Sequence, residues 1–192
     1  MPSNIHNSKA ALRNLIRAQL ETLSPAERTE ASTRACEQLK QRAVWGDARL
    51  ILFFAPLLEE IDVWPLLPEA LSAGKKVALP RFDAATDAYV ACQVENLDRD
   101  VVQGKFGIRE PRAHCPPLLP PTADLILVPG VGFDLAGRRL GRGKGFYDQL
   151  LKSIRGTKCG VAFDQQVVRE IPAEPHDVRL DYLLTPTRWV GF

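Results

Sequence analysis

Short apolar runs recur along the chain between polar, proline-containing stretches, and they predict buried strands. An apolar run of roughly four to eight residues bounded by turn signals is typical of a strand that is covered on both faces. Residues 124–128 form the most apolar of these runs. The other runs that predict strands are residues 49–54, 75–80, 158–163 and 179–184, while residues 88–94 and 97–103 predict a hairpin or an irregular excursion.

Helix signals lie between these runs. Leu12, Ile16 and Leu20 recur every fourth residue, which places them on one face of a helix. Residues 24–27, Ser-Pro-Ala-Glu, form a capping box with proline at the first helical position, so a second helix should begin there. The predicted helices cover residues 8–22 with Ser8 as a cap, residues 25–41, residues 62–74 with Asp62 as a cap, and residues 145–155 closed by Gly156.

The alternation of short apolar strands with helices predicts an α/β fold. This order of elements gives a mostly parallel sheet with helices on both faces. A chain of 192 residues suits one domain, so we expect residues 1–192 to form a single domain. Ligands bind beyond the carboxyl ends of the strands in such sheets. The loop after Val128 lies in that place, and residues 104–121, rich in proline and glycine, predict a second loop.

The loop after Val128 combines glycines with positive charges. Neighbouring positive charges repel one another, and ordering a glycine-rich loop carries an entropic cost. A multiply charged anion would offset both costs. Glycine lets backbone N–H groups approach phosphate oxygens, and the N-terminus of a following helix adds a favourable dipole. The loop therefore predicts a nucleotide phosphate as its ligand, with a solvated basic turn as the alternative. Its glycines are Gly137, Gly141, Gly143 and Gly145, and its cations are Arg138, Arg139, Arg142 and Lys144.

The common nucleotide-binding motifs do not fit this loop. Lys144 is followed by Gly145 rather than by Ser or Thr, and Arg138 stands where the leading glycine of a Walker A loop should be. The glycines also alternate with other residues from position 141 to 145, unlike those of a GxGxxG motif. By themselves, the residues of this loop predict an anion-binding loop after a strand and nothing more specific.

Charged residues outside the loop are weaker candidates. Lys9 and Arg13 lie one helical turn apart, so their side chains converge, although a solvated helix face is the commoner explanation for such a pair. Glu59, Glu60 and Asp62 follow a predicted strand. One of these carboxylates would be placed to hold an amide or amine of a substrate, and a helix-capping acidic cluster is the alternative.

Two aspartates are candidate ligands of a hard cation. Asp148 comes directly after the basic loop, where a cation would lie beside bound phosphates. A simple charge partner for Arg142 or Lys144 is the alternative. Asp177, in a loop flanked by prolines, would supply a second carboxylate. The chain has neither an HxH nor an HExxH pattern, so we expect no transition-metal site.

Composition and charge narrow the class of protein. The net charge is only +2, which argues against a broad basic surface for nucleic acid. No apolar run approaches membrane-spanning length, and residues 1–13 have no apolar signal-peptide core. The four cysteines are far apart and form no CxxC pair, which is typical of a reduced cytoplasmic protein without a zinc site. We therefore expect a cytoplasmic protein with neither nucleic acid nor membrane as a partner.

At several of these positions the chain resembles the 5-formyltetrahydrofolate cyclo-ligases, also called methenyltetrahydrofolate synthetases. The long motif PGVGFDxxGxRLGRGKGxYD at residues 129–148 is the most specific part of the resemblance. The other matching segments are KxxxR at 9–13, EID at 60–62, GKxVxxPR at 74–81, GIxEP at 107–111, Gln166, Ile171-Pro172 and His176-Asp177.

The resemblance implies a three-layer α/β/α sandwich and a reaction that depends on ATP and Mg²⁺. In this family, 5-formyltetrahydrofolate and ATP give 5,10-methenyltetrahydrofolate, ADP and phosphate. The formyl oxygen attacks the γ-phosphate to give a phosphorylated imidate, and N10 then closes the ring as phosphate leaves. By resemblance, we expect a small-molecule folate substrate, which polyglutamylation can extend, and a monomeric protein.

The resemblance also assigns roles to residues. It implies catalytic roles for Arg142, Lys144 and Tyr147, and magnesium binding by Asp148 and Asp177. The chain differs from the family pattern at Phe54 and Phe146, where many relatives carry tyrosine. Neither difference removes a charge. ATP would be bound by Lys9, Arg13, Arg139, Leu140, Gly141, Arg142, Gly143, Lys144, Gly145, Phe146 and Tyr147, and the folate by Ala55, Glu60, Arg142, Lys144 and Phe146.

Two other classes of protein remain as alternatives. The first is an enzyme on a similar fold that needs no ATP, such as a phosphosugar isomerase or a CoA transferase, and such proteins lack the RLGRGKG loop. The second is a homologue that binds folate or nucleotide without catalysis. Loss of Lys9, Arg13, Lys144 or Asp148 would indicate such a homologue, and all four are present.

Overall fold

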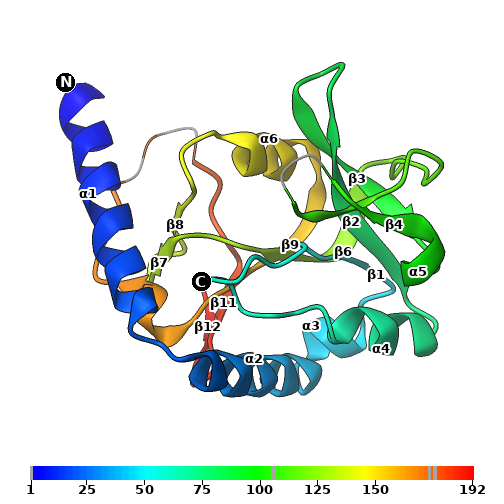
Figure 1. Cartoon of the computed structure of the whole chain (residues 1–192), viewed down its shortest axis with the longest axis horizontal. Helices are drawn as coiled ribbons and strands as arrows, with labels where there is room; N and C mark the ends of the chain where they lie inside the picture. The colour runs from blue at the N-terminus through cyan, green and yellow to red at the C-terminus, as the bar shows by residue number, and fades with distance from the viewer. Residues whose placement is uncertain (1, 105–106, 173, 175–176) are drawn as a thin grey trace.

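A seven-stranded sheet forms the centre of the protein (Figure 1). The computed structural model describes residues 2–104, 107–172, 174 and 177–192. All neighbouring strands are parallel except the two edge strands, which are antiparallel to their neighbours. The order across the sheet is β12 (Trp189–Gly191), β11 (Tyr182–Leu184), β9 (Arg155–Val161), β6 (Thr122–Val128), β1 (Leu50–Leu52), β2 (Lys76–Asp83) and β3 (Ala88–Val94).

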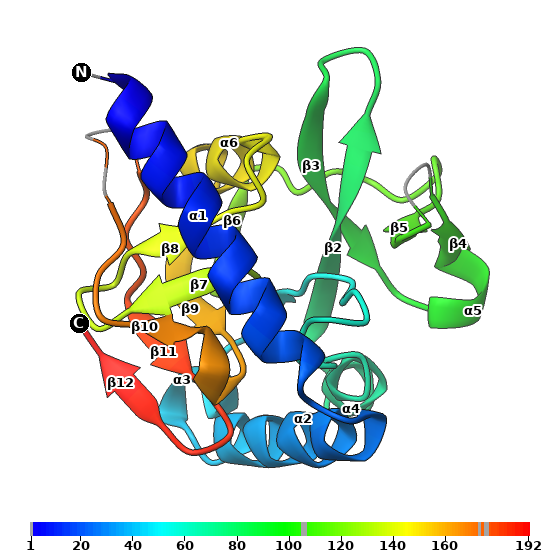
Figure 2. The same cartoon turned by 60° about the vertical axis from the view of Figure 1, so that its left-hand side comes forward.

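Helices cover both faces of this sheet, so the predicted α/β/α sandwich is confirmed. One face is covered by α2 (Pro25–Lys40), α3 (Ala43–Gly46) and α4 (Leu66–Ser72), and the other by α6 (Phe146–Ser153) (Figure 1). The long helix α1 (Pro2–Glu21) lies beside the sandwich, across a small second sheet (Figure 2). That sheet consists of β10 (Val167–Val168), β7 (Gly132–Asp134) and β8 (Arg139–Leu140), and the short helix η1 (Asp164–Gln166) precedes β10.

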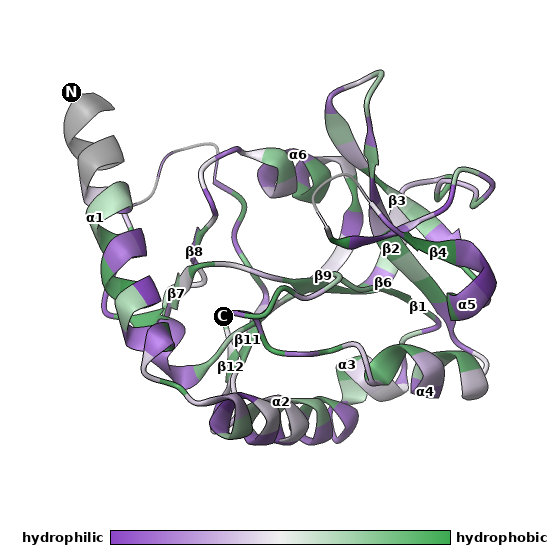
Figure 3. Ribbon diagram, viewed as in Figure 1, coloured by the Kyte–Doolittle hydropathy of each residue, from purple (hydrophilic) through white to green (hydrophobic). Residues whose placement is uncertain are grey.

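The side-chain alternation of the central strands explains the two layers. Ile51 packs into the core below α2 and α4, whereas its neighbour Leu52 packs into the core below α6. Leu127 and Val128 divide between the two cores in the same way. Because successive side chains of a strand point to opposite faces, a strand covered on both faces must be apolar throughout. Figure 3 shows this concentration of apolar residues on the central strands.

The helix ends agree with the sequence signals only in part. The capping box that opens α2 is present, since Ser24 Oγ accepts the backbone N–H of Glu27 and the Glu27 carboxylate accepts that of Ser24. The prediction that Ser8 caps the first helix is wrong, because α1 begins at Pro2. Asp62 accepts the N–H of Trp64, and α4 begins later, at Leu66, so Asp62 caps a turn instead of the helix.

Gly156 does not close α6 as predicted. The helix ends at Ser153, and Gly156 lies near the start of β9 with a φ of +143°. A Cβ at this position would lie 1.8 Å from the carbonyl oxygen of Ala123. The glycine therefore marks a close approach of β9 to β6, which a local sequence signal cannot distinguish from a helix end.

Of the two alternatives predicted for residues 88–94 and 97–103, the hairpin between them is wrong. Strand β3 pairs with β2, which continues to Asp83, three residues beyond the end predicted from the apolar run. Residues 97–103 form α5 (Leu97–Asp100) and β4 (Val101–Gln103) instead. Strand β4 pairs with β5 (Arg109–Pro111), which lies inside the segment predicted as loop. The short elements α3 and β12 were also not predicted, because each is only three or four residues long.

In the described part of the chain, no helix is long and apolar enough to cross a membrane.

Candidate active site

A cavity of about 340 Å³ lies beyond the carboxyl ends of β1 and β6, between the glycine loop and the β2–β3 hairpin. It is therefore in the place where parallel sheets bind ligands. Ten residues with a predicted site role line it: Ala55, Glu60, Arg139, Gly141, Arg142, Lys144, Gly145, Phe146, Tyr147 and Asp148. The lining residues without a predicted role are Phe54, Leu57, Pro80, Tyr89, Ile108, Arg109, Glu110, Pro129 and Gly130.

The glycine loop reaches the cavity through a strand, a turn and a helix start. After β8, the chain turns at Gly143 and Gly145, whose φ angles of +105° and +73° favour glycine strongly. Gly145 is the N-cap of α6. Arg13 of α1 packs against this turn, where its Nε donates a hydrogen bond to the carbonyl oxygen of Gly141 at 2.8 Å. A cation distant in sequence is thus held beside the loop.

Carboxylates from other segments pair with the cations assigned to phosphate. Arg139 Nη2 lies 2.6 Å from Asp148 Oδ1. Lys9 Nζ lies 2.8 Å from Glu174 and 3.1 Å from Asp177, and these two carboxylates raise the pKa of Lys9 despite the opposing effect of its burial. Both predicted metal ligands are thus ion-paired within the protein. The partner of Asp148 is Arg139, whereas the sequence analysis considered Arg142 or Lys144 as its charge partner.

Arg142 crosses from the glycine loop to the segment after β1. Its guanidinium lies 3.0 Å from Glu59 and 3.1 Å from Glu60. Burial raises the pKa of Glu60, and this effect outweighs both Arg142 and the N–H that Leu57 donates to the carboxylate. Burial lowers the pKa of Arg142, but the attraction of Glu60 and Glu59 outweighs it and raises that pKa overall. The pair therefore fixes a positive charge beside a carboxyl group that is costly to ionise.

Three aromatic rings, Tyr89, Phe146 and Tyr147, line the site, and Phe82 packs behind them. Tyr89 of β3 makes edge contacts with Phe82 at 5.6 Å and with Phe146 at 5.8 Å between ring centroids. Tyr89 also contacts Tyr147 at 6.3 Å, and the guanidinium of Arg139 lies 5.9 Å from the Tyr147 ring. Burial raises the pKa of Tyr147 well above its usual value, so this hydroxyl stays protonated and can donate a hydrogen bond.

Five predicted residues do not line the cavity: Lys9, Arg13, Leu140, Gly143 and Asp177. Leu140 is only 1% exposed, and its carbonyl accepts the N–H of Val131 inside the small sheet. Its side chain thus belongs to the core, and a contact with ATP stays a prediction. Arg13 and Gly143 lie close together, because a Cβ built at Gly143 would be 3.7 Å from the Arg13 guanidinium. His176, which the resemblance included, lies outside the described residues.

Sequence reasoning missed the part of the site supplied by β3 and β5. A role for Tyr89 was not predicted, because a hairpin with residues 97–103 was expected for its strand. The structure pairs β3 with β2 and places Tyr89 opposite Phe82. Ile108, Arg109 and Glu110 belong to the GIxEP segment at residues 107–111, which was matched but was given no role. Arg109 also stacks on Trp64, 4.2 Å from the ring centroid.

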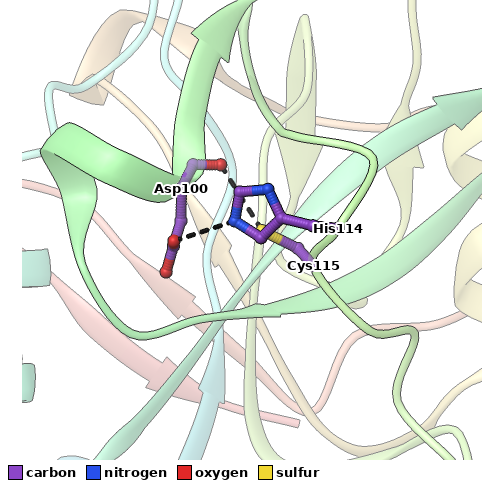
Figure 4. Close-up of side chains that lie close together, drawn as sticks. All are labelled: Asp100, His114 and Cys115. Carbon is purple, nitrogen blue, oxygen red and sulfur yellow. Dashed lines mark hydrogen bonds and ion pairs between the residues drawn. The ribbon is translucent and has the colours of Figure 1, made fainter.

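One group of possible metal ligands occurs among the described residues, and it lies away from this cavity. Asp100, His114 and Cys115 come together where α5 meets the segment after β5 (Figure 4). The Asp100 carboxylate already accepts hydrogen bonds from Arg99, His114 and two backbone N–H groups, and these contacts lower its pKa. The Cys115 thiol donates to the Asp100 carbonyl, and burial raises its pKa. The group is a satisfied structural cluster.

The fold and the cavity define an α/β protein with a cationic, glycine-rich loop beside a pocket lined by aromatic residues. A model of the 5-formyltetrahydrofolate cyclo-ligase family matches residues 5–186, and the chain belongs to that family.

Relatives and solved structures agree with this assignment. The chain is 39% identical to a 5-formyltetrahydrofolate cyclo-ligase of Mycolicibacterium smegmatis over 74% of this chain and 76% of the relative. It is 29% identical to that of Escherichia coli over 91% and 98%. The NMR structure of Aquifex aeolicus 5,10-methenyltetrahydrofolate synthetase superposes with a TM-score of 0.86 at 34% identity, over 95% of this chain and 92% of the other.

The conformation of the glycine loop leads to a prediction about stability. We expect Gly145→Ala to lower the free energy of unfolding by about 1 kcal/mol, because an L-residue at a φ of +73° is strained even where the space is open. Gly46→Ala is the matched control, since Gly46 also has open space but lies in α3 without a positive φ. Urea unfolding of both variants measures the difference, and equal effects of the two substitutions would contradict the assigned backbone strain.

Proposed function

We propose that this chain converts 5-formyltetrahydrofolate and ATP to 5,10-methenyltetrahydrofolate, ADP and phosphate, with Mg²⁺. The observation that carries the proposal is the composition of the cavity in a member of this family. Cations and glycines of one loop line this cavity together with aromatic and aliphatic residues. A site of this kind suits a polyphosphate and a flat heterocycle bound next to each other.

The reaction requires activation of a formyl group that is amide-like. Its carbonyl carbon is a poor electrophile and its oxygen is a poor leaving group. Attack of the formyl oxygen on the γ-phosphorus forms an O–P bond, breaks the bond to the β-phosphate oxygen and releases ADP. N10 then forms a bond to the activated carbon, phosphate leaves with the former formyl oxygen, and N10 loses its proton. Such phosphoryl transfer depends chiefly on positioning and on charge neutralisation.

The loop cations supply this neutralisation. Arg142 and Lys144 both line the cavity and would neutralise charge on the transferred phosphoryl group. Tyr147, which stays protonated, donates a hydrogen bond between the two substrates. Lys9, Arg13 and Arg139 hold the remaining phosphates, and Gly141, Gly143 and Gly145 let the backbone approach them.

The aspartates suit magnesium in their donor chemistry. Asp148 and Asp177 offer carboxylate oxygens, the hard ligands that Mg²⁺ prefers. Each is paired here with a cation assigned to phosphate, Arg139 or Lys9. Phosphates that take up these cations would release the carboxylates, so nucleotide and cation would bind together. The bound ion would neutralise charge on the phosphates.

The setting of the reaction follows from the same reasoning. We propose a monomeric protein in which residues 1–192 act as a single cyclo-ligase domain on a folate with or without a polyglutamate tail. Both cores share one sheet, which supports the single domain. The four cysteines are buried and unpaired by disulfides, which supports a reducing compartment such as the cytoplasm.

The proposal is tested by absorbance at the methenyl-folate band. Purified protein is mixed with 5-formyltetrahydrofolate and Mg²⁺, with and without ATP. We expect a rise only when ATP is present, and chelation of Mg²⁺ should abolish it. No rise, with ATP binding still detected by calorimetry, would favour a non-catalytic homologue. A change in substrate without ATP would favour another enzyme on a similar fold.

Removal of the Lys144 charge should affect turnover and not folding. We expect Lys144→Ala to lower turnover by about two orders of magnitude or more, because this charge stabilises the transferred phosphoryl group in the transition state. Lys152→Ala is the control, since Lys152 is an exposed lysine of the adjoining helix α6. Steady-state rates and urea unfolding are measured for both variants. Unchanged turnover in Lys144→Ala would refute its role.

Substitution of Glu60 should affect the binding of folate more than the binding of ATP. We expect Glu60→Gln to weaken folate binding by about tenfold and ATP binding less, because a neutral amide is a weaker acceptor for folate N–H groups. Loss of the ion pair with Arg142 would instead change both affinities. Calorimetry with each ligand separately measures the two effects. If they are equal, Glu60 acts through Arg142 and not on the folate.

A further inference from the structure

A second buried carboxyl group, Glu110 of β5, lines the same cavity. The residue is only 6% exposed. Its Oε2 accepts the backbone N–H of Phe82 at a long 3.3 Å. Its Oε1 is buried and has no hydrogen-bond partner among the described residues. Because nearly all buried polar atoms in proteins are hydrogen-bonded, such an oxygen beside a cavity needs an explanation.

The fold makes room for this carboxyl group. A Cβ at Gly104 would lie 2.5 Å from Cδ and 2.8 Å from Oε1 of Glu110, so no larger residue fits at position 104 without displacing the side chain. Burial raises the pKa of Glu110, and the N–H of Phe82 and the charge of Arg81 offset that effect only in part. Arg81 itself donates to the carbonyl groups of Arg112 and Cys115. The protein thus holds the Glu110 carboxyl group in a closely packed position, where nearby donors and charges offset the cost of its burial only in part.

Glu110 and Glu60 each act on a different member of a pair of neighbouring tyrosines. Burial and then the charge of Glu60 raise the pKa of Tyr147, and burial and then the charge of Glu110 raise that of Tyr89. The two rings contact each other with centroids 6.3 Å apart. Glu60 is tied to Arg142 of the phosphate loop, whereas Glu110 lies on the side of the cavity with Pro80 and Ile108. A flat ring lying along the tyrosines would present one edge to each carboxyl group.

We propose that Glu110 binds the folate substrate by accepting hydrogen bonds from the adjacent 2-amino and N3–H groups of its pterin ring. This inference rests on the proposed function. The two donors are side by side and match the two oxygens of a carboxylate, one of which has no hydrogen-bond partner among the described residues. The adenine of ATP offers a single amino group at the corresponding edge and belongs with the phosphates at the cationic side. Glu60 is then left for the end of the ring near the reacting formyl group.

Binding measurements on Glu110→Gln test this assignment, because glutamine keeps the shape and loses the charge. We expect the dissociation constant of 5-formyltetrahydrofolate to rise about tenfold or more, and that of a non-hydrolysable ATP analogue to change less than about twofold. The urea midpoint should stay the same or rise, since a poorly compensated buried charge is removed. Glu95→Gln is the control: Glu95 precedes α5 on the same side of the protein, and its side chain is 71% exposed. It should change none of these values.

A folate analogue with a methyl group in place of the 2-amino group gives a second test that needs no variant. The wild-type protein should bind this analogue about tenfold more weakly than 5-formyltetrahydrofolate, and Glu110→Gln should show little further difference between the two ligands. Equal binding of both ligands by the wild-type protein would overturn the proposal, even if Glu110→Gln did not fold.

The remaining outcomes separate this proposal from the others. Unchanged folate binding by Glu110→Gln would overturn it. A loss of ATP binding alone would place adenine at Glu110, and weaker binding of both ligands with a lower urea midpoint would show a structural role. A wild-type protein that binds the ATP analogue but neither folate would refute the proposed function itself, whereas intact wild-type folate binding with an insensitive Glu110 variant would refute only this assignment.

Discussion

The positive charge of the glycine loop must be balanced by carboxylates from other parts of the chain, and the arrangement of the site depends on this constraint. Arg142 ties the loop to the segment after β1 through Glu59 and Glu60. Arg139 ties it to the first turn of α6 through Asp148. Arg13 joins it to α1 through a backbone carbonyl. Four cations near glycine would otherwise repel one another, so these contacts give the loop a defined shape before any ligand binds.

The same contacts are compatible with the proposed binding of a polyanion to an ordered loop. An ion pair inside the protein can be exchanged for a pair between cation and phosphate at a small net cost, because one anion replaces another. The released carboxylates would remain close to the new anion and repel it, unless a divalent cation takes them up. Cation and nucleotide are thus expected to stabilise each other's binding. This coupling needs no change in the fold, only a change of partners among side chains already present.

The sequence predicted the parts of the fold and site that are encoded locally. The buried strands 124–128 and 75–80, the capping box before α2 and the loop before α6 each carry their signal within a few residues. Pairing between segments carries no such signal. Strand β3 could be assigned to β2 only in three dimensions, and Gly156 resembled a helix end until β6 was placed beside it. The side of the cavity formed by β3 and β5 was missed for this reason.

The glycine loop and Glu110 differ in how their charges are balanced, and the proposed function offers a reason for this difference. In the glycine loop, cations are paired within the protein, since an unpaired cluster would deform the loop. At the edge of the cavity formed by β5, which is paired to β4, Glu110 is held with one oxygen unsatisfied. An unsatisfied buried carboxyl reduces stability, but it avoids the cost of breaking an internal hydrogen bond when a ligand arrives. A ligand with two adjacent N–H donors therefore gains more from this side than from a pre-satisfied site, which favours selective binding of a neutral heterocycle there.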